Sequence, residues 1–188
     1  MLYSVWITRP NAISVLMLVV LILFIGPVDS TPEEPTREVP ASEILEKIQR
    51  GEDVAYDHVI IKGDLDLSLL ELPTWHVNRT RWDLAVAQLA EKLKVVISQI
   101  KITNSRIDGN LKLNDTVFQK SIEFSGINIS GIADFRGSTF SGDADFDESK
   151  FGGDAYFARS QFSGYAYFRG SWFSGYTDFR GSTFSGDA

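Results

Sequence analysis

Large apolar side chains recur in the second half of this sequence at alternating steps of five and six residues. Residues 133 to 157 read ADFRGSTFSGDADFDESKFGGDAYF, in which the register is set by Phe135, Phe140, Phe146, Phe151 and Phe157. An amphipathic helix has a period of about 3.6 residues and a half-buried strand alternates every second residue, so neither fits this spacing. The sequence therefore predicts an internal repeat.

The register runs without a break from Ile102 to Phe184. Twelve of the thirteen phenylalanines lie on it, and the other one belongs to an apolar run near the amino terminus. We expect these twelve side chains to form ladders in the core: Phe118, Phe124, Phe135, Phe140, Phe146, Phe151, Phe157, Phe162, Phe168, Phe173, Phe179 and Phe184. In the earliest units the same inward position is held by isoleucine or leucine.

A small residue stands two positions before each phenylalanine from residue 133 onward, as Ala133 does before Phe135. Residues two apart on an extended segment point to the same side, so each unit turns one small and one large side chain inward. One short face cannot bury this pair, whereas stacked coils can. If two eleven-residue units make one coil, side chains 22 positions apart stack, as Phe135, Phe157 and Phe179 would do.

Glycine also recurs every eleven residues between the units. The positions are Gly142, Gly153, Gly164, Gly175 and Gly186. Because a chain that turns a corner needs permissive backbone angles, we expect these glycines to supply them.

The small-x-large units ADF, STF, ADF, SKF, AYF and SQF resemble the motif of the pentapeptide-repeat proteins, in a variant where phenylalanine is the large residue. The resemblance covers roughly residues 96–188 and implies an all-β solenoid, namely a right-handed quadrilateral parallel β-helix. The departure from the family pattern is a sixth residue in every second unit, which lengthens each coil by two residues. We therefore expect two of the four corners to be looser than in strict members.

The first thirty residues read as a targeting segment. Arg9 precedes the apolar run from Ile13 to Ile25, and Asp29 follows it. Positive charge before such a run and acidic charge after it predict that the remainder of the chain lies outside the cytoplasm. The run has the length of a signal-peptide core and is short for a membrane helix. Residues 1–30 are thus predicted to be a signal peptide or an uncleaved membrane anchor, and the protein is predicted to be secreted or membrane-anchored.

The rest of the chain divides by composition and register. Residues 31–41 carry three prolines and read as a linker. Residues 42–58 are predicted to cap the open end of the solenoid with a short helix that starts at a capping Ser42. The β-helix is predicted for residues 59–188, with an insertion at about 73–95. Within the insertion, the pattern from Asp83 to Lys94 predicts a short helix.

Composition and motifs point away from catalysis and from nucleic acid. The chain has no cysteine, only two histidines and a formal net charge of −7, so thiolate metal sites are excluded and a nucleic-acid backbone is a poor partner. No P-loop, nucleophile elbow or zinc-protease motif occurs. We predict a non-enzymatic protein without a cofactor or a metal.

One acidic corner invites a calcium interpretation. Asp143, Asp145 and Asp147 alternate, but Glu148 stands where a calcium loop needs glycine, and Phe146 points inward in their midst. A solvated acidic corner is the favoured interpretation. The same carboxylates are the only candidates for an alternative function, a polysaccharide-active enzyme on a β-helix scaffold.

Five aromatic residues lie off the inward positions: Tyr156, Tyr165, Tyr167, Trp172 and Tyr176. Such residues can form a contact surface for a protein or a carbohydrate, or they can simply suit strand surfaces. Because positions eleven apart fall on opposite faces, we expect a belt rather than one patch. The sequon at Asn78 lies in the insertion and is a candidate glycosylation site.

The predicted function is a structural scaffold or an interaction surface for a protein or carbohydrate partner. Some relatives implied by the resemblance mimic DNA and bind topoisomerase through a strongly acidic face, but residues 102–188 are only mildly acidic. The final coil has no evident cap, so we also expect either a longer natural chain or self-association through this coil.

Overall fold

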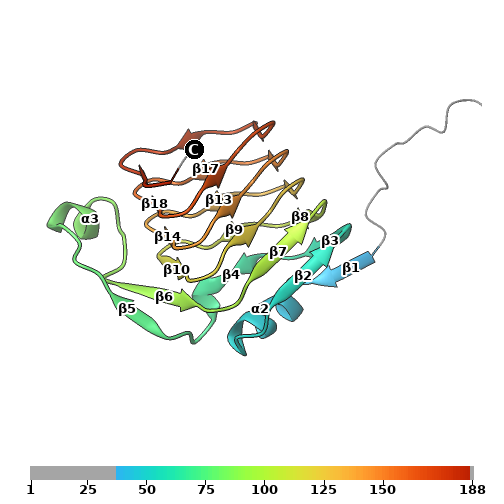
Figure 1. Ribbon diagram of the computed structural model, residues 1–188, viewed down its shortest axis with the longest axis horizontal. Coiled ribbons are helices and arrows are strands. Elements are labelled where there is room, and N and C mark those ends of the chain that lie inside the picture. The colour runs from blue at the N-terminus through green and yellow to red at the C-terminus, as the bar shows by residue number, and fades with distance from the viewer. Residues whose placement is uncertain (1–36, 187–188) are drawn as a thin grey trace, which may run out of the picture. The chain divides into compact units, whose positions relative to one another are not determined.

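The computed structural model describes residues 37–186, in which four sheets form the sides of a β-helix (Figure 1). The predicted signal or anchor segment, residues 1–30, lies outside the described residues. We name each side after its first strand in the first full coil: the β2, β3, β4 and β6 faces. The chain visits them in that spatial order once per coil, with the β4 and β6 faces separated by the insertion in the first coil.

Two faces come from the first half of each coil. The β2 face contains β2 (Val54–Asp57), β7 (Ile100–Thr103), β11 (Ile122–Glu123), β15 (Ala144–Asp145) and β19 (Ala166–Tyr167). The β3 face contains β1 (Arg37–Pro40), β3 (Val59–Lys62), β8 (Arg106–Asp108), β12 (Asn128–Ile129), β16 (Lys150–Phe151) and β20 (Trp172–Phe173).

The other two faces complete the coil. The β4 face contains β4 (Leu65–Asp66), β9 (Leu111–Lys112), β13 (Ala133–Asp134), β17 (Ala155–Tyr156) and β21 (Thr177–Asp178). The β6 face contains β5 (Thr74–His76), β6 (Lys92–Val96), β10 (Thr116–Phe118), β14 (Thr139–Phe140), β18 (Gln161–Phe162) and β22 (Thr183–Phe184). Pairing is parallel throughout these sheets except between β5 and β6.

The register between successive repeat coils is 22 residues, as the spacing of the phenylalanines predicts. Phe140 pairs with Phe118 below it and with Phe162 above it. Their rings stack as well: the centroids of Phe140 and Phe162 are 4.6 Å apart, and the planes are within 7° of parallel. The predicted four-sided parallel β-helix is therefore confirmed.

The core is built from the predicted phenylalanine positions. The structure buries eight of the twelve rings almost completely: Phe118, Phe124, Phe135, Phe140, Phe146, Phe151, Phe157 and Phe162. Phe168, Phe173 and Phe179 are partly buried against this core. Phe184, in the last described strand, is 42% exposed.

Serine occupies the small position of every second unit for a hydrogen-bonding reason. The Ser149 hydroxyl donates to the carbonyl of Phe124 at 2.6 Å, and the Ser160 hydroxyl donates to that of Phe135 at 2.7 Å. The carbonyl of Phe135 already accepts the backbone N–H of Ser138, at 3.2 Å, which closes the tight corner. The serine of the next coil thus gives this buried carbonyl a second donor.

The recurring glycines serve close packing rather than unusual backbone angles, so the sequence-based explanation is wrong. Positive φ occurs at the other corner of the unit, for example at Gly170 with φ of 68°. A Cβ added to Gly153 would lie 2.5 Å from the carbonyl oxygen of Gly131, and one added to Gly175 would lie 2.6 Å from that of Gly153. No side chain fits where one coil passes so close to the next.

Helix α2 (Ala41–Gln49) covers the first end of the core with Ile44, Leu45 and Ile48, which are buried. It starts directly after Pro40 and has no side-chain cap, so the predicted capping role of Ser42 is wrong. The predicted linker is wrong over residues 37–40, which form β1 and pair with β3. The predicted cap segment, 42–58, is wrong over residues 54–57, which form β2, because these residues pair with β7 of the next coil.

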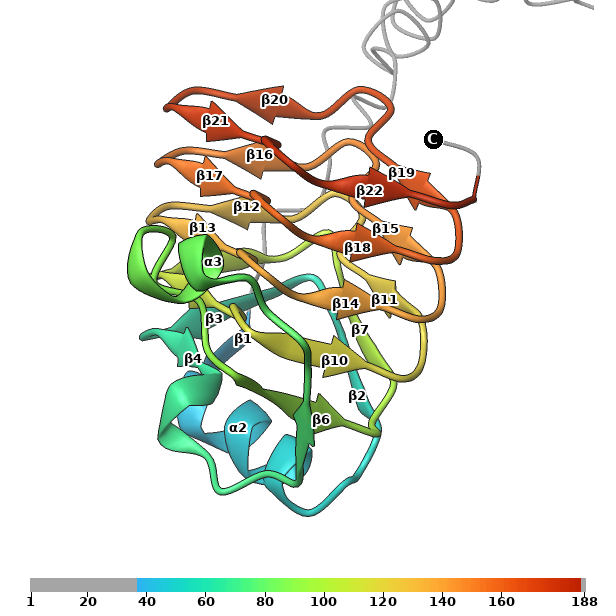
Figure 2. The same cartoon turned by 90° about the vertical axis from the view of Figure 1, so that its left-hand side faces the viewer.

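The insertion separates the β4 face from the β6 face in the first coil. Leu65 pairs with a residue 46 positions later, Leu111, whereas Lys94 pairs with one 22 positions later, Thr116, and the difference of 24 residues is the insertion. The insertion contains η1 (Leu67–Leu69), β5 and α3 (Arg81–Ala85). Figure 2 shows it beside the coils, with α3 projecting near the ends of β13 and β14.

The predicted helix from residue 83 to residue 94 is mostly wrong, since α3 ends at Ala85 and residues 92–96 form β6. The predicted insertion, 73–95, accordingly overlaps β6. Leu93 and Val95 are buried and pack with Val117 of the neighbouring strand β10. This pairing across coils decides the conformation of a segment whose local pattern also suits a helix. Among residues 37–186, no helix is long and apolar enough to cross a membrane.

Candidate functional site

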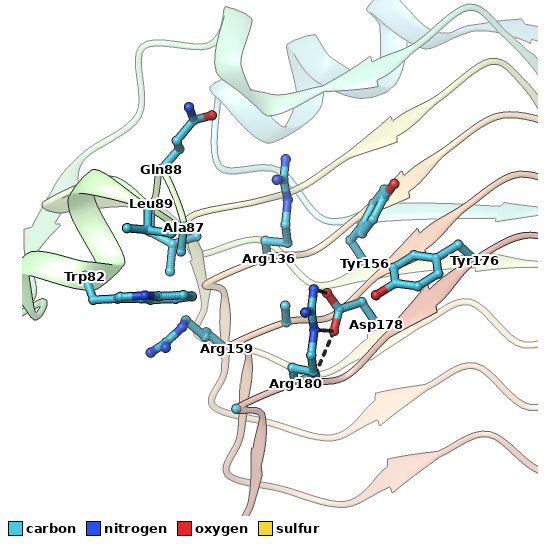
Figure 3. A pocket seen from close by; sticks show the side chains of 13 residues that line it. Trp82, Ala87, Gln88, Leu89, Arg136, Tyr156, Arg159, Tyr176, Asp178 and Arg180 are labelled. Carbon is cyan, nitrogen blue, oxygen red and sulfur yellow. Dashed lines mark hydrogen bonds and ion pairs between the residues drawn. The ribbon is translucent and has the colours of Figure 1, made fainter.

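A groove of about 580 Å³ lies between the insertion and the β4 face. Figure 3 shows Trp82 and Leu89 of the insertion on one side, and Tyr156 and Tyr176 of the β-helix on the other. Arginine side chains line the space between these two walls (Figure 3). We call this feature the aromatic–arginine groove; its lining residues are Trp82, Val86, Ala87, Gln88, Leu89, Arg136, Tyr156, Ala158, Arg159, Tyr176, Asp178, Arg180 and Gly181.

The insertion wall depends on a short helix with a complete cap. The backbone N–H of Asp83 donates to the Thr80 hydroxyl oxygen at 3.2 Å, and the Thr80 backbone N–H donates to the Asp83 carboxylate at 2.9 Å. This reciprocal capping box starts α3 immediately before the groove. Trp82, in the first turn, is left 51% exposed, although the guanidinium of Arg159 lies over its ring.

Arg79 attaches the insertion to the β-helix. Its guanidinium donates to the carbonyl of Gly137 at 2.7 Å and to the Asp115 carboxylate at 3.1 Å. Burial raises the pKa of Asp115, an effect that the backbone N–H of Ala90 and the charge of Arg79 partly offset. Because Gly137 and Asp115 lie at corners of successive coils, one side chain fixes the insertion to two coils.

Arg159 makes a second attachment, closer to the groove. Its guanidinium carbon lies 4.3 Å from the centroid of the Trp82 ring, and the guanidinium forms an ion pair with Asp83. The backbone of Arg159 has φ of 58°, whereas the equivalent positions in the adjacent coils are glycines, Gly137 and Gly181. Alternate coils carry a side chain at this strained corner, since Asp115 of the same column also has positive φ, of 50°.

The opposite wall is part of the rigid β4 face. The rings of Tyr156 and Tyr176 are 6.0 Å apart, and the guanidinium of Arg136 lies 5.4 Å from the Tyr156 centroid. The Tyr156 hydroxyl donates to Asp154 at 3.0 Å, which fixes the ring in place. Tyr176 is 54% exposed and faces the groove.

The arginines of the groove are neutralised by carboxylates. The Arg180 guanidinium donates to the buried Asp178 through Nε at 2.9 Å and through Nη2 at 2.7 Å. These hydrogen bonds hold the pKa of Asp178 below its usual value. Arg136 pairs in the same way with Asp134, which raises the pKa of the guanidinium. With Arg159 on Asp83, each arginine in the lining has an acidic partner among the described residues.

The structure brings together only two of the five aromatic residues singled out in the sequence. Tyr156 and Tyr176 line the groove, whereas Tyr165 and Tyr167 stack on each other beside the β2 face, with centroids 5.9 Å apart. Trp172 lies on the β3 face in β20. The five residues therefore lie on three faces. Sequence reasoning missed Trp82 and the groove arginines.

The aspartates of the acidic corner accept hydrogen bonds from backbone N–H groups. Asp143 accepts the backbone N–H of Tyr165 at 2.9 Å, and Asp147 accepts that of Arg169 at 2.7 Å. The Asp145 carboxylate accepts the backbone N–H of Asp147, and burial raises the pKa of Asp145. Two of the three carboxylates thus hold the next coil. Within residues 37–186, no cluster of three or more histidine or carboxylate side chains is arranged to bind a metal ion.

Asn78 is exposed in the segment that leads into α3. The hydroxyl of its sequon partner Thr80 donates to Asp83 at 2.6 Å. Modification of Asn78 stays a prediction, as does self-association through the last coil.

Stacked parallel coils around ladders of like residues define a β-helical repeat scaffold. A family model described as pentapeptide repeats (9 copies) matches residues 113–161, 124–172 and 146–188. Residues 113–188 therefore match the pentapeptide-repeat family, as the sequence predicts, and the predicted right-handed, quadrilateral β-helix is confirmed. No curated protein and no solved structure matches the chain.

Proposed function

We propose that this repeat scaffold is a non-enzymatic interaction protein that binds a protein or carbohydrate partner in the aromatic–arginine groove. One observation carries the proposal: Trp82 and Tyr176, both about half exposed, come from distant parts of the chain and face the same groove. Half-exposed aromatic rings combine apolar contact area with few side-chain torsions, which suits them to binding surfaces. A rigid scaffold with a functional loop is a frequent arrangement for binding sites.

Site-specific photo-cross-linking tests this proposal. A photoreactive amino acid is introduced at Val86, an exposed groove residue, and in a second variant at Lys150, an exposed residue on the β3 face. Irradiation in the native cells should give a discrete cross-linked product from position 86 only. Equal products from both positions, or none from position 86, would contradict binding at the groove.

The bulk of the chain is further proposed to lie outside the cytoplasm, either secreted or held at a membrane by residues 1–30. The order of charge around the apolar run supports this proposal. Cell fractionation shows the compartment in which the chain lies, and determination of the mature amino terminus shows whether residues 1–30 are removed. A cytoplasmic product that starts at Met1 would overturn export and would favour the topoisomerase alternative.

The competing proposal is a polysaccharide-active enzyme that uses the carboxylates from Asp143 to Glu148. The raised pKa of Asp145 is the observation in its favour. The backbone hydrogen bonds of Asp143 and Asp147 favour a structural role instead. An assay for new reducing ends on a panel of polysaccharides separates the two, with Asp145→Asn as the variant that should abolish any genuine activity.

A further inference from the structure

We infer that the ligand of the aromatic–arginine groove is a neutral oligosaccharide, an inference that rests on the proposed function. The inference starts from the charge of the groove. Arg136, Arg159 and Arg180 are bound to Asp134, Asp83 and Asp178, respectively. An anionic ligand such as a phosphate, a nucleic acid or an acidic peptide would have to compete with a carboxylate that already holds each guanidinium.

The aromatic side chains supply the next argument. Trp82 stands on the insertion wall, and Tyr156 and Tyr176 stand on the opposite wall (Figure 3). The faces of a sugar ring carry C–H groups that pack against aromatic rings, while its hydroxyls remain at the edge. The groove of about 580 Å³ is a space of ordinary ligand size. A short oligosaccharide would pack on the two tyrosine rings and on the part of the Trp82 ring that the Arg159 guanidinium leaves uncovered.

The fixed polar groups favour a sugar over a proline-rich peptide, which also binds aromatic grooves. Two hydrogen bonds hold Arg180 against Asp178, so the guanidinium is fixed in direction and its remaining N–H groups are donors in place before a ligand arrives. Gln88 adds an amide that both donates and accepts. Sugar hydroxyls can serve both kinds of group, whereas proline has no N–H to donate to an acceptor.

The two walls have different roles in this arrangement. Tyr176 belongs to the rigid β-helix, whereas the position of Trp82 depends on the contacts that Arg159 and Arg79 make with the insertion. The β4 face therefore provides a fixed platform, and the insertion provides the ring that closes the groove from the other side. Removal of either ring should weaken binding without unfolding the scaffold, because both rings are about half exposed.

The test is a titration of the full chain, kept in a detergent without a sugar headgroup, with neutral gluco-, manno- and chito-oligosaccharides. Calorimetry should show saturable binding of at least one of them. Trp82→Ala and Tyr176→Ala should each weaken it by about tenfold or more, a change of about 1.4 kcal/mol. Trp75→Ala, at a 59% exposed tryptophan outside the groove, should leave the affinity within about twofold. Affinity should hardly change between about 50 and about 500 mM NaCl, because the ligand is uncharged.

Three outcomes would overturn the oligosaccharide inference: binding of none of these sugars, equal binding by the groove and control variants, or binding only of a sulfated oligosaccharide with strong salt dependence. A sulfated oligosaccharide and a proline-rich peptide are titrated in parallel. If the peptide alone binds and Trp82→Ala abolishes its binding, the groove remains an interaction site and the sugar inference fails. If photo-cross-linking from position 86 also gives nothing, both proposals fail.

Discussion

Replacement of Phe146 by alanine should lower the free energy of unfolding by about 4–5 kcal/mol. The side chain is fully buried, and its ring stacks on Phe168 with centroids 5.0 Å apart and planes within 10° of parallel. Below it lies Phe124 at 5.9 Å, and Phe135 and Phe157 meet it edge-on at 5.3 and 5.6 Å. Truncation of a buried phenylalanine costs about 3–5 kcal/mol. The upper end applies here because backbone pairing on both sides prevents the neighbouring coils from closing the cavity.

The assay is urea unfolding of the full chain, followed by circular dichroism and by tryptophan fluorescence, whose coincidence checks for a single transition. Lys150→Ala is the matched control, since this lysine is exposed on the same coil, and it should change stability by less than about 0.5 kcal/mol. A loss at Phe146 below about 1.5 kcal/mol, or one equal to the loss in the control, would refute the stacked core.

The other stability predictions concern corners and the cap. Gly153→Ala should lower the free energy of unfolding by about 2–3 kcal/mol, because the added Cβ would meet the preceding coil. Gly170→Ala should lower it by about 1 kcal/mol, from backbone strain alone. Thermal melts that show equal losses of stability in the two variants would contradict the close-packing explanation. Burial and the hydrogen bond to Glu43 raise the pKa of Tyr56 to about 12. Its contribution to stability should therefore be complete below about pH 10 and be lost as the pH rises toward 12. In thermal melts from pH 8 upward, Tyr56→Phe should lose less stability than the unmodified chain as the pH rises. Equal losses of stability in the two proteins would be evidence against this linkage.

The repeat could be predicted from the sequence because a ladder needs like residues at a fixed spacing. Phe140 and Phe162 are 22 positions apart, and no competing local pattern explains that number. The recurrence of glycine could also be seen, but not its cause. Glycine can be required at position 153 either by a positive φ or by the close approach of the neighbouring coil. The distance between the coils decides which, and the spacing of residues in the sequence gives no information about that distance.

The ends of the repeat were harder to predict, for a different physical reason. Residues 92–96 carry a pattern that suits a helix locally, and they form β6 because β10 offers them a partner. Residues 37–40 contain a proline and read as a linker, yet they pair with β3 at the edge of a sheet. In both cases a tertiary pairing overrides local preference, and single-sequence reasoning has no access to it.

The groove was missed because its two walls come from segments far apart in the chain, and no repeated spacing in the sequence shows that they lie close together. Tyr156 and Tyr176 could be singled out as outward aromatics of the repeat, but Trp82 lies in a segment without any register. Arg159 gave no signal either, because alternate coils of the repeat carry a side chain at this corner, as Asp115 does in the same column and Glu148 in the opposite one.

The positive φ of Arg159 leads to a last prediction, based on two substitutions that relieve the same backbone strain. Arg159 and Glu148 both have positive φ at tight corners where other coils have glycine. Left-handed backbone costs a non-glycine residue about 1–2 kcal/mol, and glycine returns about half of that gain through its greater freedom in the unfolded chain. Glu148→Gly should therefore stabilise the β-helix by about 0.5–1 kcal/mol with no effect on the groove.

Arg159→Gly relieves the same strain but removes the guanidinium from Trp82 and from Asp83. The insertion should then open more often and be cleaved about fivefold faster by a protease, because the cation–π contact alone is worth about 1 kcal/mol. Ligand binding in the groove should weaken in this variant and stay unchanged in Glu148→Gly. If the two variants were cleaved at the same rate, Arg159 would not hold the insertion, and the strain at its backbone would have no connection with the groove.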